Sequence, residues 1–396
     1  MNKPTFATRQ FWGQGSAAHG GGVRDALLAA IGRGDAGPPF ENAVGPWVRH
    51  EGDPGTHDET TLEHPAGYIA SDDLVCAVNT ALLLGKPLLL TGSPGTGKSQ
   101  LAERVAWELN LGPVLRFESQ SLSEAQDLYY RFDLVGRLAA VEAFKAEQAL
   151  GEPDVRKHAG IELSVARFLS FGPLGKAILR ADPAQLDRLV ARGFSPEGLQ
   201  LPVVPRPSVV LIDEIDKTSR DFPNDLLNAI ERKEFHVREL PDGHIGVPDD
   251  ERLHPIVLIT SNSERELPPP FLRRCIYFHI KDATPEMLAR ILRSRVTGSG
   301  DGADMSRLYP LYADVLEMFT EFRDSSAGKL AYQPGTSELL DLARAMARGD
   351  RVDAQAGLRS SRSNHAELLR ACSTLVKHRD DRDALDKLLR RWAPTS

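Results

Sequence analysis

The stretch LLLTGSPGTGKS, residues 88–99, decides how the rest of the chain is interpreted, because an apolar run meets a glycine-rich loop that ends in a lysine and a serine. Glycines allow such a loop to turn its backbone N–H groups inward around an anion. Lys98 adds a positive charge for the β and γ phosphates of a nucleotide, and Ser99 adds a hydroxyl for Mg²⁺. A helix that begins there contributes the positive end of its dipole. The stretch therefore predicts a site for nucleotide phosphate.

The elements expected on either side of this loop support that interpretation. Residues 87–91 predict a buried strand before the loop. After the loop, Leu101, Val105 and Leu109 share one face of a predicted helix. A Gly-Pro pair at 112–113 is expected to stop it. The residues expected to hold the nucleotide are Gly92, Ser93, Pro94, Gly95, Thr96, Gly97, Lys98 and Ser99.

A further helix is expected before the strand of the phosphate loop. Ser71 is a plausible N-cap, and Gly85 is expected to end this helix. Tyr68 and Ile69 lie just ahead of it, where ordered structure is expected to begin. These two side chains could border an adenine base or simply pack in the core.

Composition excludes several classes of protein. A chain of 396 residues with 41% hydrophobic and 26% charged residues is typical of soluble proteins. Its formal charge of −7 gives no general attraction to nucleic acid or anionic membranes. Cys76, Cys275 and Cys372 lack paired spacing, which argues against a disulfide scaffold or a zinc site. Because no apolar run reaches the length of a membrane span and residues 1–10 lack a signal-peptide core, we expect the protein in the cytoplasm.

The chain is expected to divide into an extension and two domains. Residues 1–62 are rich in glycine and proline and are expected to form a flexible N-terminal extension. Residues 63–281 are expected to form an α/β nucleotide-binding domain, and residues 282–396 a small helical domain. Thr284 and Pro285 are expected to open the first helix of the latter. Its further helices are expected at 311–322, 337–347, 364–377 with Asn364 as the cap, and 384–392.

A second chemical motif follows a wholly apolar predicted strand at 208–212. Asp213 and Glu214 come directly after it, which places two carboxylates beside the phosphate loop if the strand lies in the same sheet. Asp213 can then hold Mg²⁺ through water, and Glu214 can deprotonate the water that attacks the γ-phosphate. Asp216 and Lys217 could pair with each other or with a neighbouring subunit, although a solvated surface position is the default.

A third motif ends the predicted strand at 256–260, which follows a predicted hairpin over residues 234–247. Asn262 offers both a donor and an acceptor at the tip of this strand, so its amide can hold the attacking water or contact the γ-phosphate. Asparagine is also a common turn residue, and spacing alone leaves both interpretations open.

A pair of arginines precedes the fifth predicted strand, residues 275–280. Three prolines at 268–270 stiffen the approach to Arg273 and Arg274, so both guanidinium groups are held in a defined place. A guanidinium suits the charge spread over a transferring phosphoryl group. A surface pair without a function is the ordinary alternative.

The interval between the second strand, residues 114–117, and the third is too long for one crossover helix. Residues 118–207 must therefore hold an insertion, which includes a predicted helix at 137–150. Tyr129, Tyr130 and Phe132 in it could form a surface for a partner or could pack locally.

Taken together, the phrases GSPGTGKS, VVLIDEIDK, LITSN and LPPPFLRRC resemble the AAA+ ATPases. The insertion and the hairpin resemble the helix-two-insert group, and within it the MoxR-like ATPases. The resemblance runs from about Tyr68 to Trp392. It implies a five-stranded parallel sheet with a helical lid and, usually, a ring of six subunits.

The resemblance also implies roles for individual residues. Residues 92–99 match the Walker A loop, and Asp213 and Glu214 the Walker B pair. Asn262 matches sensor 1, and Arg274 is a better match than Arg273 to the finger that acts on a neighbouring subunit. The start of the lid helix at 334–338 departs from the pattern, because it lacks the arginine commonly found at sensor 2; Arg344 lies two turns later.

The function implied is an ATP-dependent remodeler with ATP and Mg²⁺ as cofactors, similar to a chaperone. Its partners would be a protein client and, as in many MoxR-like systems, a separate protein with a von Willebrand factor A domain. An ATP-gated signalling or defence scaffold with little turnover is one alternative. A motor on nucleic acid, with Arg390 and Arg391 contributing, is another, which the acidic total charge disfavours.

Overall fold

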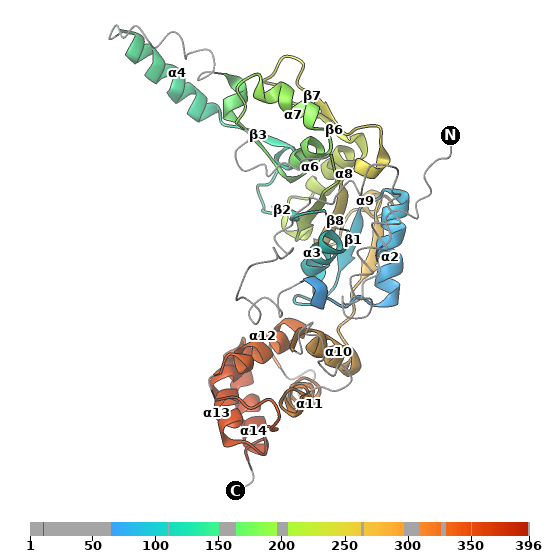
Figure 1. The fold of residues 1–396 in the computed structure, drawn as a ribbon, viewed down its shortest axis with the longest axis vertical. Helices are drawn as coiled ribbons and strands as arrows, with labels where there is room; N and C mark the ends of the chain where they lie inside the picture. Colours follow the sequence, from blue (N-terminus) through green and yellow to red (C-terminus); the bar gives the residue numbers. More distant parts are fainter. Residues whose placement is uncertain are drawn as a thin grey trace, which may run out of the picture.

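The structure is a computed structural model, and it describes residues 11, 65–109, 111–149, 164–195, 205–262, 265–296, 309–325, 330–349 and 351–394. An α/β domain with a central sheet is followed by a helical domain, drawn at the bottom of Figure 1 beside the C-terminus. The predicted extension over residues 1–62 lies outside the described residues, apart from Phe11. Nowhere in the described ranges is a helix long and apolar enough to cross a membrane.

The central sheet consists of five parallel strands, which confirms the predicted fold class. They are β1 (Leu88–Thr91), β2 (Leu115–Glu118), β5 (Val209–Asp213), β8 (Ile256–Ser261) and β9 (Ile276–His279). Their order across the sheet is β2-β5-β8-β1-β9. Leu88 at the start of β1 lies opposite Leu258 of β8 and Ile276 of β9. Because all five strands run the same way, the segments that follow β1, β5 and β8 meet at one edge.

Helices cover both faces of the sheet because the strands are apolar on both sides. Leu88 and Leu90 of β1 belong to the core beneath α2 and α3, whereas Leu89 belongs to the core on the opposite face, beneath α6 and α8. This alternation follows from the two-residue repeat of a strand. The helices are α2 (Asp72–Leu84), α3 (Lys98–Glu108), α6 (Pro173–Ala181) and α8 (Phe222–Arg232).

The two ends of α2 are those that the sequence predicts. The side chain of Ser71 accepts a hydrogen bond from the backbone N–H of Leu74 at 3.3 Å, as an N-cap does. Gly85 follows the helix with φ +59°, the left-handed conformation that glycine adopts at little cost. The helix is therefore fixed immediately before β1 and the phosphate loop.

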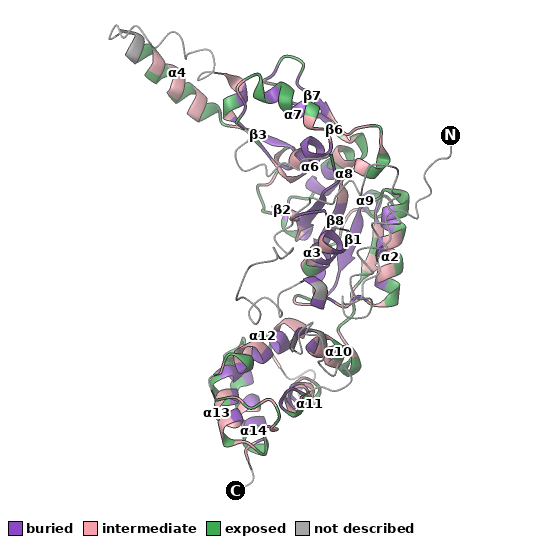
Figure 2. Cartoon of the chain, in the orientation of Figure 1, coloured by how far each residue is buried: buried purple, intermediate pink, exposed green. Residues whose placement is uncertain are grey.

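The predicted insertion between β2 and β5 is present and forms a small unit of its own. It contains the antiparallel strands β3 (Tyr130–Phe132) and β4 (Leu169–Phe171), and the helices α4 (Leu134–Ala149), α6 and α7 (Pro183–Val190). Helix α4 projects away from the rest of the domain (Figure 1), and its surface is exposed or half-buried (Figure 2).

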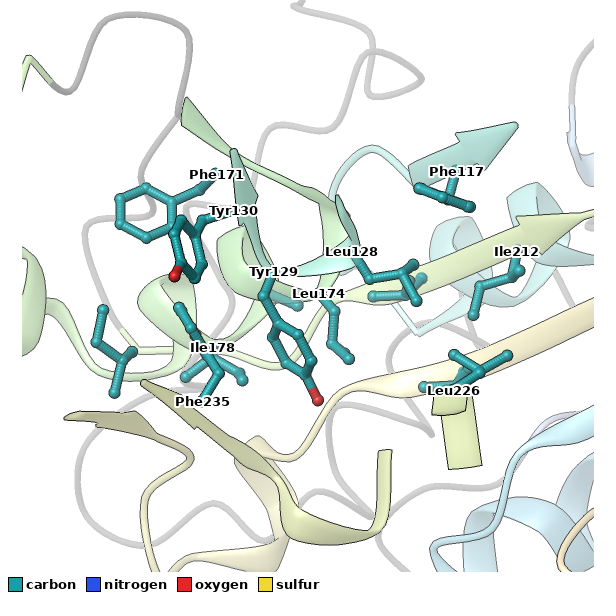
Figure 3. Packing of buried hydrophobic residues seen from close by; sticks show 14 of the residues in the cluster. Phe117, Leu128, Tyr129, Tyr130, Phe171, Leu174, Ile178, Ile212, Leu226 and Phe235 are labelled. Carbon is teal, nitrogen blue, oxygen red and sulfur yellow. The ribbon is translucent and has the colours of Figure 1, made fainter. Parts of the chain in front are cut away.

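The predicted aromatic cluster of the insertion packs in the core of the α/β domain, and Phe132, its one half-buried member, lies against the same core. Tyr129 and Tyr130 are buried, and both rings stack on Phe235 with centroids 4.7 Å and 6.0 Å away. Phe171 meets the same ring edge-on at 6.2 Å. Figure 3 shows this cluster together with Leu174 and Ile178 of α6. Stacking of this kind joins the insertion to the hairpin that precedes β8.

That hairpin confirms the predicted element, although its strands are shorter than expected. It pairs β6 (Glu234–His236) with β7 (His244–Gly246) in antiparallel register. Asp242 in the connecting turn has φ +54°, and the N–H of Val237 donates to the carbonyl of Gly243 at 2.8 Å. The turn therefore begins at Val237, which shortens the first strand.

The helical domain forms a separate core around Trp392, which has no exposed surface. It follows the short helix α9 (Pro269–Leu272) and strand β9 of the α/β domain. Its helices are α10 (Pro285–Val296), α11 (Pro310–Ser325), α12 (Thr336–Ala347), α13 (Arg362–Ala371) and α14 (Arg382–Arg391).

One predicted helix of this domain begins and ends elsewhere. The expected helix over 364–377 is α13, which ends at Ala371, and its N-cap is Ser361 rather than Asn364. The hydroxyl of Ser361 accepts from the backbone N–H of Asn364 at 3.2 Å. Asn364 is fully buried inside the helix, where its amide bonds to backbone groups of Asp353 and Ala356. The expectation was wrong because both residue types are common N-caps and the buried role leaves no mark in the sequence.

Candidate active site

The phosphate loop is closed on itself by its lysine. Lys98, the first residue of α3, donates from Nζ to the carbonyl oxygens of Gly92 at 2.7 Å and Ser93 at 2.9 Å. Burial lowers the pKa of Lys98, and the nearby carboxylates of Asp213, Asp216 and Glu214 oppose that change. The ammonium group is thus held inside the loop, where a phosphate could replace the carbonyl oxygens as its partner.

Two glycines of the loop are required by their surroundings. Gly92 has φ +145°, and a Cβ atom there would lie 2.5 Å from the carbonyl oxygen of Ile280. Gly97, with φ +88°, has Tyr68 against it, and a Cβ would come within 3.1 Å of the tyrosine ring. Tyr68 is buried, and burial raises its pKa. It therefore packs against the loop as a neutral phenol; contact of Tyr68 or Ile69 with adenine stays a prediction.

Asp213 at the end of β5 is tied to the phosphate loop across the sheet edge. The hydroxyl of Ser99 donates to Oδ1 of Asp213 at 2.9 Å and lies 3.0 Å from its Oδ2. Thr260 of β8 also donates its hydroxyl to Oδ1. The structure thus brings Ser99 and Asp213 together, as expected of two residues that share a metal ion.

These two side chains suit Mg²⁺. A serine hydroxyl and a carboxylate are hard oxygen donors, and Mg²⁺ is usually held by one or two carboxylates or hydroxyls together with phosphate oxygens and water. Within the described ranges, no group of three or more His, Cys, Asp or Glu side chains could hold a metal ion by itself. The donor set therefore fits a magnesium ion that arrives with a nucleotide.

Glu214 occupies a strained backbone position directly after β5. Its φ of +56° is uncommon for a residue with a side chain, and such outliers gather at functional sites. Its N–H donates to the hydroxyl of Thr260 at 2.9 Å. Its carboxylate accepts from Nδ2 of Asn262 at 2.9 Å and from the ammonium group of Lys217. The carboxylate is thereby fixed between the tips of β5 and β8.

Asn262 joins the same network, and so does a residue expected at the solvated surface. The N–H of Asn262 donates to Oδ1 of Asp216 at 3.2 Å, and Asp216 is only 4% exposed. The default expectation for Asp216 was therefore wrong, because the backbone after β8 needs a buried acceptor. Lys217 pairs with Glu214.

Sequence reasoning missed Thr260, which contacts both members of the acidic pair. Its hydroxyl accepts from the N–H of Glu214 and donates to Asp213. Inside an apolar strand, a threonine looks like any β-branched residue. Its place, one position before the last residue of β8, was the available signal, because a hydroxyl there faces the end of the adjacent strand.

Arg274 lies away from these residues. It follows α9 and precedes the amino end of β9, whose register aligns Ile276 with Leu88, the first residue of β1. Its Nε forms an ion pair with Glu231 of α8 at 2.9 Å, and both side chains are about half exposed. Arg273 beside it is also exposed. The phosphate loop follows the opposite end of β1, so neither arginine faces the phosphate loop of its own chain.

The helical domain contacts the phosphate loop through a serine. The hydroxyl of Ser337, in the first turn of α12, donates to the carbonyl oxygen of Gly95 at 3.1 Å. Gly335 caps this helix, with its N–H donating to Glu338 at 2.8 Å. Arg344, two turns later, pairs with Asp341 at 3.4 Å.

Comparison with known proteins finds one family model and a set of similar solved structures. Residues 87–275 match the family model of the AAA domain of the dynein-related subfamily. Among solved structures, the RuvB Holliday junction branch migration motor of Thermotoga maritima is 16% identical, with a TM-score of 0.35, over 78% of this chain and 69% of that one. The AAA domain of FIGL-1 in complex with ADP is also 16% identical, with a TM-score of 0.31, over 78% of each chain. Curated proteins give no match.

The family match spans the phosphate loop, the Asp213–Glu214 pair, the tip of β8 and the arginines before β9. The match begins at the start of β1 and ends just before β9. In the sheet, β9 is an edge strand and β1 is its neighbour. Residues 87–275 are thus similar to the AAA domain of the dynein-related subfamily, and the chain has the α/β fold of the AAA+ ATPases.

Proposed function

We propose that this protein binds ATP and hydrolyses it to ADP and phosphate. The observation that carries the proposal is the meeting of five polar side chains at the carboxyl edge of the sheet. Four of them form two hydrogen-bonded pairs, one between the phosphate loop and the end of β5 and one between the ends of β5 and β8, and the fifth, a lysine, lies in the loop itself. The five are Lys98, Ser99, Asp213, Glu214 and Asn262.

Each residue has a role that its surroundings support. The backbone of residues 92–99 and the Lys98 ammonium group bind the phosphates. Ser99 and Asp213 hold Mg²⁺, which when bound neutralises charge on the phosphates. Glu214 takes a proton from the attacking water, and Asn262, which already contacts that carboxylate, orients the water.

The remaining group of the site comes from another subunit in this proposal. A cation that stabilises charge on the transferring phosphoryl group is a common part of such sites, and it can contribute about 10³ to 10⁵ in rate. Arg274 is exposed at the other edge of the sheet, so it can serve only a neighbouring copy. We therefore infer a ring of subunits, with six as the number that the family resemblance favours.

The work done by hydrolysis is proposed to be the remodelling of a client protein, as in MoxR-like ATPases. The contact between Ser337 and Gly95 supports this, because it connects the helical domain to the loop that binds phosphate. Movement of that loop would pass directly to α12. A separate protein with a von Willebrand factor A domain is the proposed partner.

Substitution of Glu214 by glutamine tests the central step. The change keeps the size and the hydrogen bond from Asn262 but removes the base, so ATP binding persists while hydrolysis falls at least a hundredfold. Glu142→Gln on the exposed helix α4 is the matched control and retains full activity. Equilibrium binding of ATP and release of phosphate are the two measurements. Normal turnover of Glu214→Gln would contradict the assignment.

One observation favours a second function, that of an ATP-gated scaffold. The first turn of α12 reaches the phosphate loop with Ser337 and not with an arginine, so the helical domain has no positive charge there to respond to the γ-phosphate. A scaffold needs ATP only for assembly. Turnover measured under conditions in which the subunits assemble separates the two functions, because a scaffold shows assembly that depends on ATP and almost no phosphate release.

A further inference from the structure

Phe11 is held on the α/β domain although it lies 54 positions before Pro65, where the domain begins. Its ring has no exposed surface and belongs to the core that contains Leu74 and Val78 of α2. The residue belongs to no helix or strand. A single aromatic side chain from a remote part of the chain thus completes the core on this face of the sheet.

One side chain of α2 recognises the backbone of Phe11 at both of its polar groups. The N–H of Phe11 donates to Oδ1 of Asn79 at 2.8 Å, and Nδ2 of Asn79 donates to the carbonyl oxygen of Phe11 at 2.8 Å. A side-chain amide is the group that can accept and donate in this way, because it carries a carbonyl beside an NH₂ group. The pairing copies the one that a neighbouring β-strand would offer.

The position of Asn79 within α2 indicates that this contact is the reason for the residue. Asparagine is a poor helix former and usually serves as a cap or in a turn, yet Asn79 lies in the middle of the 13-residue helix. Its polar atoms serve a residue 68 positions away instead of the helix itself. Asn79 is therefore explained by the peptide it binds.

We propose that the face of α2 around Asn79 is a peptide-docking site and that its occupant is the N-terminal segment of the same chain, anchored by Phe11. The apolar recess takes the aromatic ring, and Asn79 fixes the direction of the peptide through its backbone. A contact of one residue is weak between separate molecules, but the connecting chain raises the local concentration of the segment. The site lies on the face of the sheet covered by α2 and α3, and it contains none of the residues proposed to bind ATP.

Cleavage by trypsin tests the docking in the full-length chain. A protease needs an extended, free segment around the bond it cuts, and Arg9 lies two positions before the anchored residue. We expect Asn79→Asp to speed cleavage after Arg9 at least tenfold, because the carboxylate keeps the size but cannot donate to the carbonyl of Phe11. Cleavage after Arg33 in the same molecule is the internal control and should not change between the two proteins.

Phe11→Ala provides the second variant, and it leaves α2 itself intact. It should show the same faster cleavage after Arg9, and it should then bind a synthetic peptide of residues 5–17, measured by fluorescence anisotropy. The same peptide with alanine at position 11 should not bind. Thermal unfolding and ATP binding of both variants report whether the domain itself is preserved.

Three results would overturn the proposal. Equal cleavage after Arg9 in the unchanged protein and in both variants would show that no docking occurs in solution. Failure of the peptide to bind the Phe11→Ala chain even at millimolar concentration, about the local concentration that a connecting chain supplies, would show that α2 holds no peptide site. Protection of Arg9 that rises with protein concentration would assign the occupant to a second copy of the chain instead of the same one.

Discussion

The two edges of the central sheet differ in how fully their charged side chains are paired. At the carboxyl edge, Lys98, Asp213 and Glu214 all find partners in their own chain, within a few residues of the phosphate loop. At the amino edge, the buried Arg180 and Arg206 lie beside the Gly112 turn, each with nitrogen atoms that have no hydrogen-bond partner in the described part of the chain. Arg274 is exposed at that same edge.

This difference suggests that one chain alone does not complete the proposed active site, because the proposed arginine lies at the opposite edge of the sheet. The carboxyl edge has the residues proposed to bind the phosphates and to activate the water, whereas Arg274, the arginine proposed to complete the site, lies at the amino edge. The amino edge has these arginines and also an apolar pocket of about 500 Å³ between α2 and α8. If Arg274 serves a neighbouring copy, as proposed, one subunit presents the two halves of a site at opposite edges of its sheet.

Mixing of two inactive variants gives the largest expected effect. Arg274→Ala alone should lower hydrolysis by about 10³ to 10⁵ with ATP binding unchanged, because the cation is lost from every interface. Lys98→Ala alone should lose nucleotide binding. Mixed rings should recover part of the activity, since a Lys98→Ala subunit still donates its arginine to an intact phosphate loop.

Arg273→Ala is the control in that experiment and should stay active. Recovery by mixing, measured as phosphate release at several ratios of the two proteins, is the decisive observation. If Arg274→Ala hydrolysed ATP normally and Arg273→Ala did not, the two edges would still cooperate, through the other arginine.

Removal of the Thr260 hydroxyl should weaken the positioning of Asp213 and Glu214 but still allow ATP to bind. Thr260→Val leaves the N–H of Glu214 and one oxygen of Asp213 without this partner, a loss of about 1–3 kcal/mol. We expect hydrolysis to fall about tenfold to a hundredfold, with a smaller change in ATP affinity. Thr80→Val on α2, whose hydroxyl bonds only to a carbonyl of its own helix, is the control. Equal activity of the two variants would remove Thr260 from the site.

Removal of the buried charge of Arg180 at the amino edge should make the folded protein more stable. Burial and the neighbouring Arg206 lower the pKa of Arg180 to about 10. Because this value lies below that of the unfolded chain, the charged group destabilises the fold at neutral pH, and the penalty fades only as the pH rises past 10. Arg180→Met should raise the free energy of unfolding by about 1–3 kcal/mol in urea at pH 7.

The exposed Arg188→Met is the control for that measurement and should change stability little. A loss of stability in Arg180→Met would mean that the buried guanidinium has a compensating partner.

Thiol labelling gives the smallest effect and leaves function untouched. Cys275 lies beside β9 at the amino edge, and burial raises its pKa to about 12, whereas Cys76 on α2 is exposed. Iodoacetamide at pH 8 should label Cys76 and spare Cys275, because only the thiolate reacts. Mass spectrometry of the digested protein measures both. Rapid labelling of Cys275 would show that the start of β9 opens readily.

The sequence predicts best what local patterns encode. The loop around Lys98, the apolar strand before Asp213 and the cap at Ser71 each leave a signature within a few positions, and each element lies where expected. The family resemblance extends this to the parallel sheet. Burial that depends on distant residues leaves no such signature, which is why Asp216, Thr260 and Asn364 were misjudged or missed.

The same limit applies to the N-terminal segment. Phe11 stands in a region of glycines and prolines, where one phenylalanine looks incidental. Its hydrogen bonds to Asn79, 68 positions away, are the observation that gives either residue a structural role. Pair contacts at this separation cannot be read from the spacing of residues along one sequence.

The serine contact between α12 and the phosphate loop has a consequence for the order of events in a cycle. Ser337 touches Gly95 through a main-chain carbonyl, so it follows the shape of the loop and is blind to how many phosphates lie inside. The helical domain would then distinguish a loaded subunit from an empty one. In the proposed ring, the moment of bond cleavage would be reported by the guanidinium of the adjacent copy.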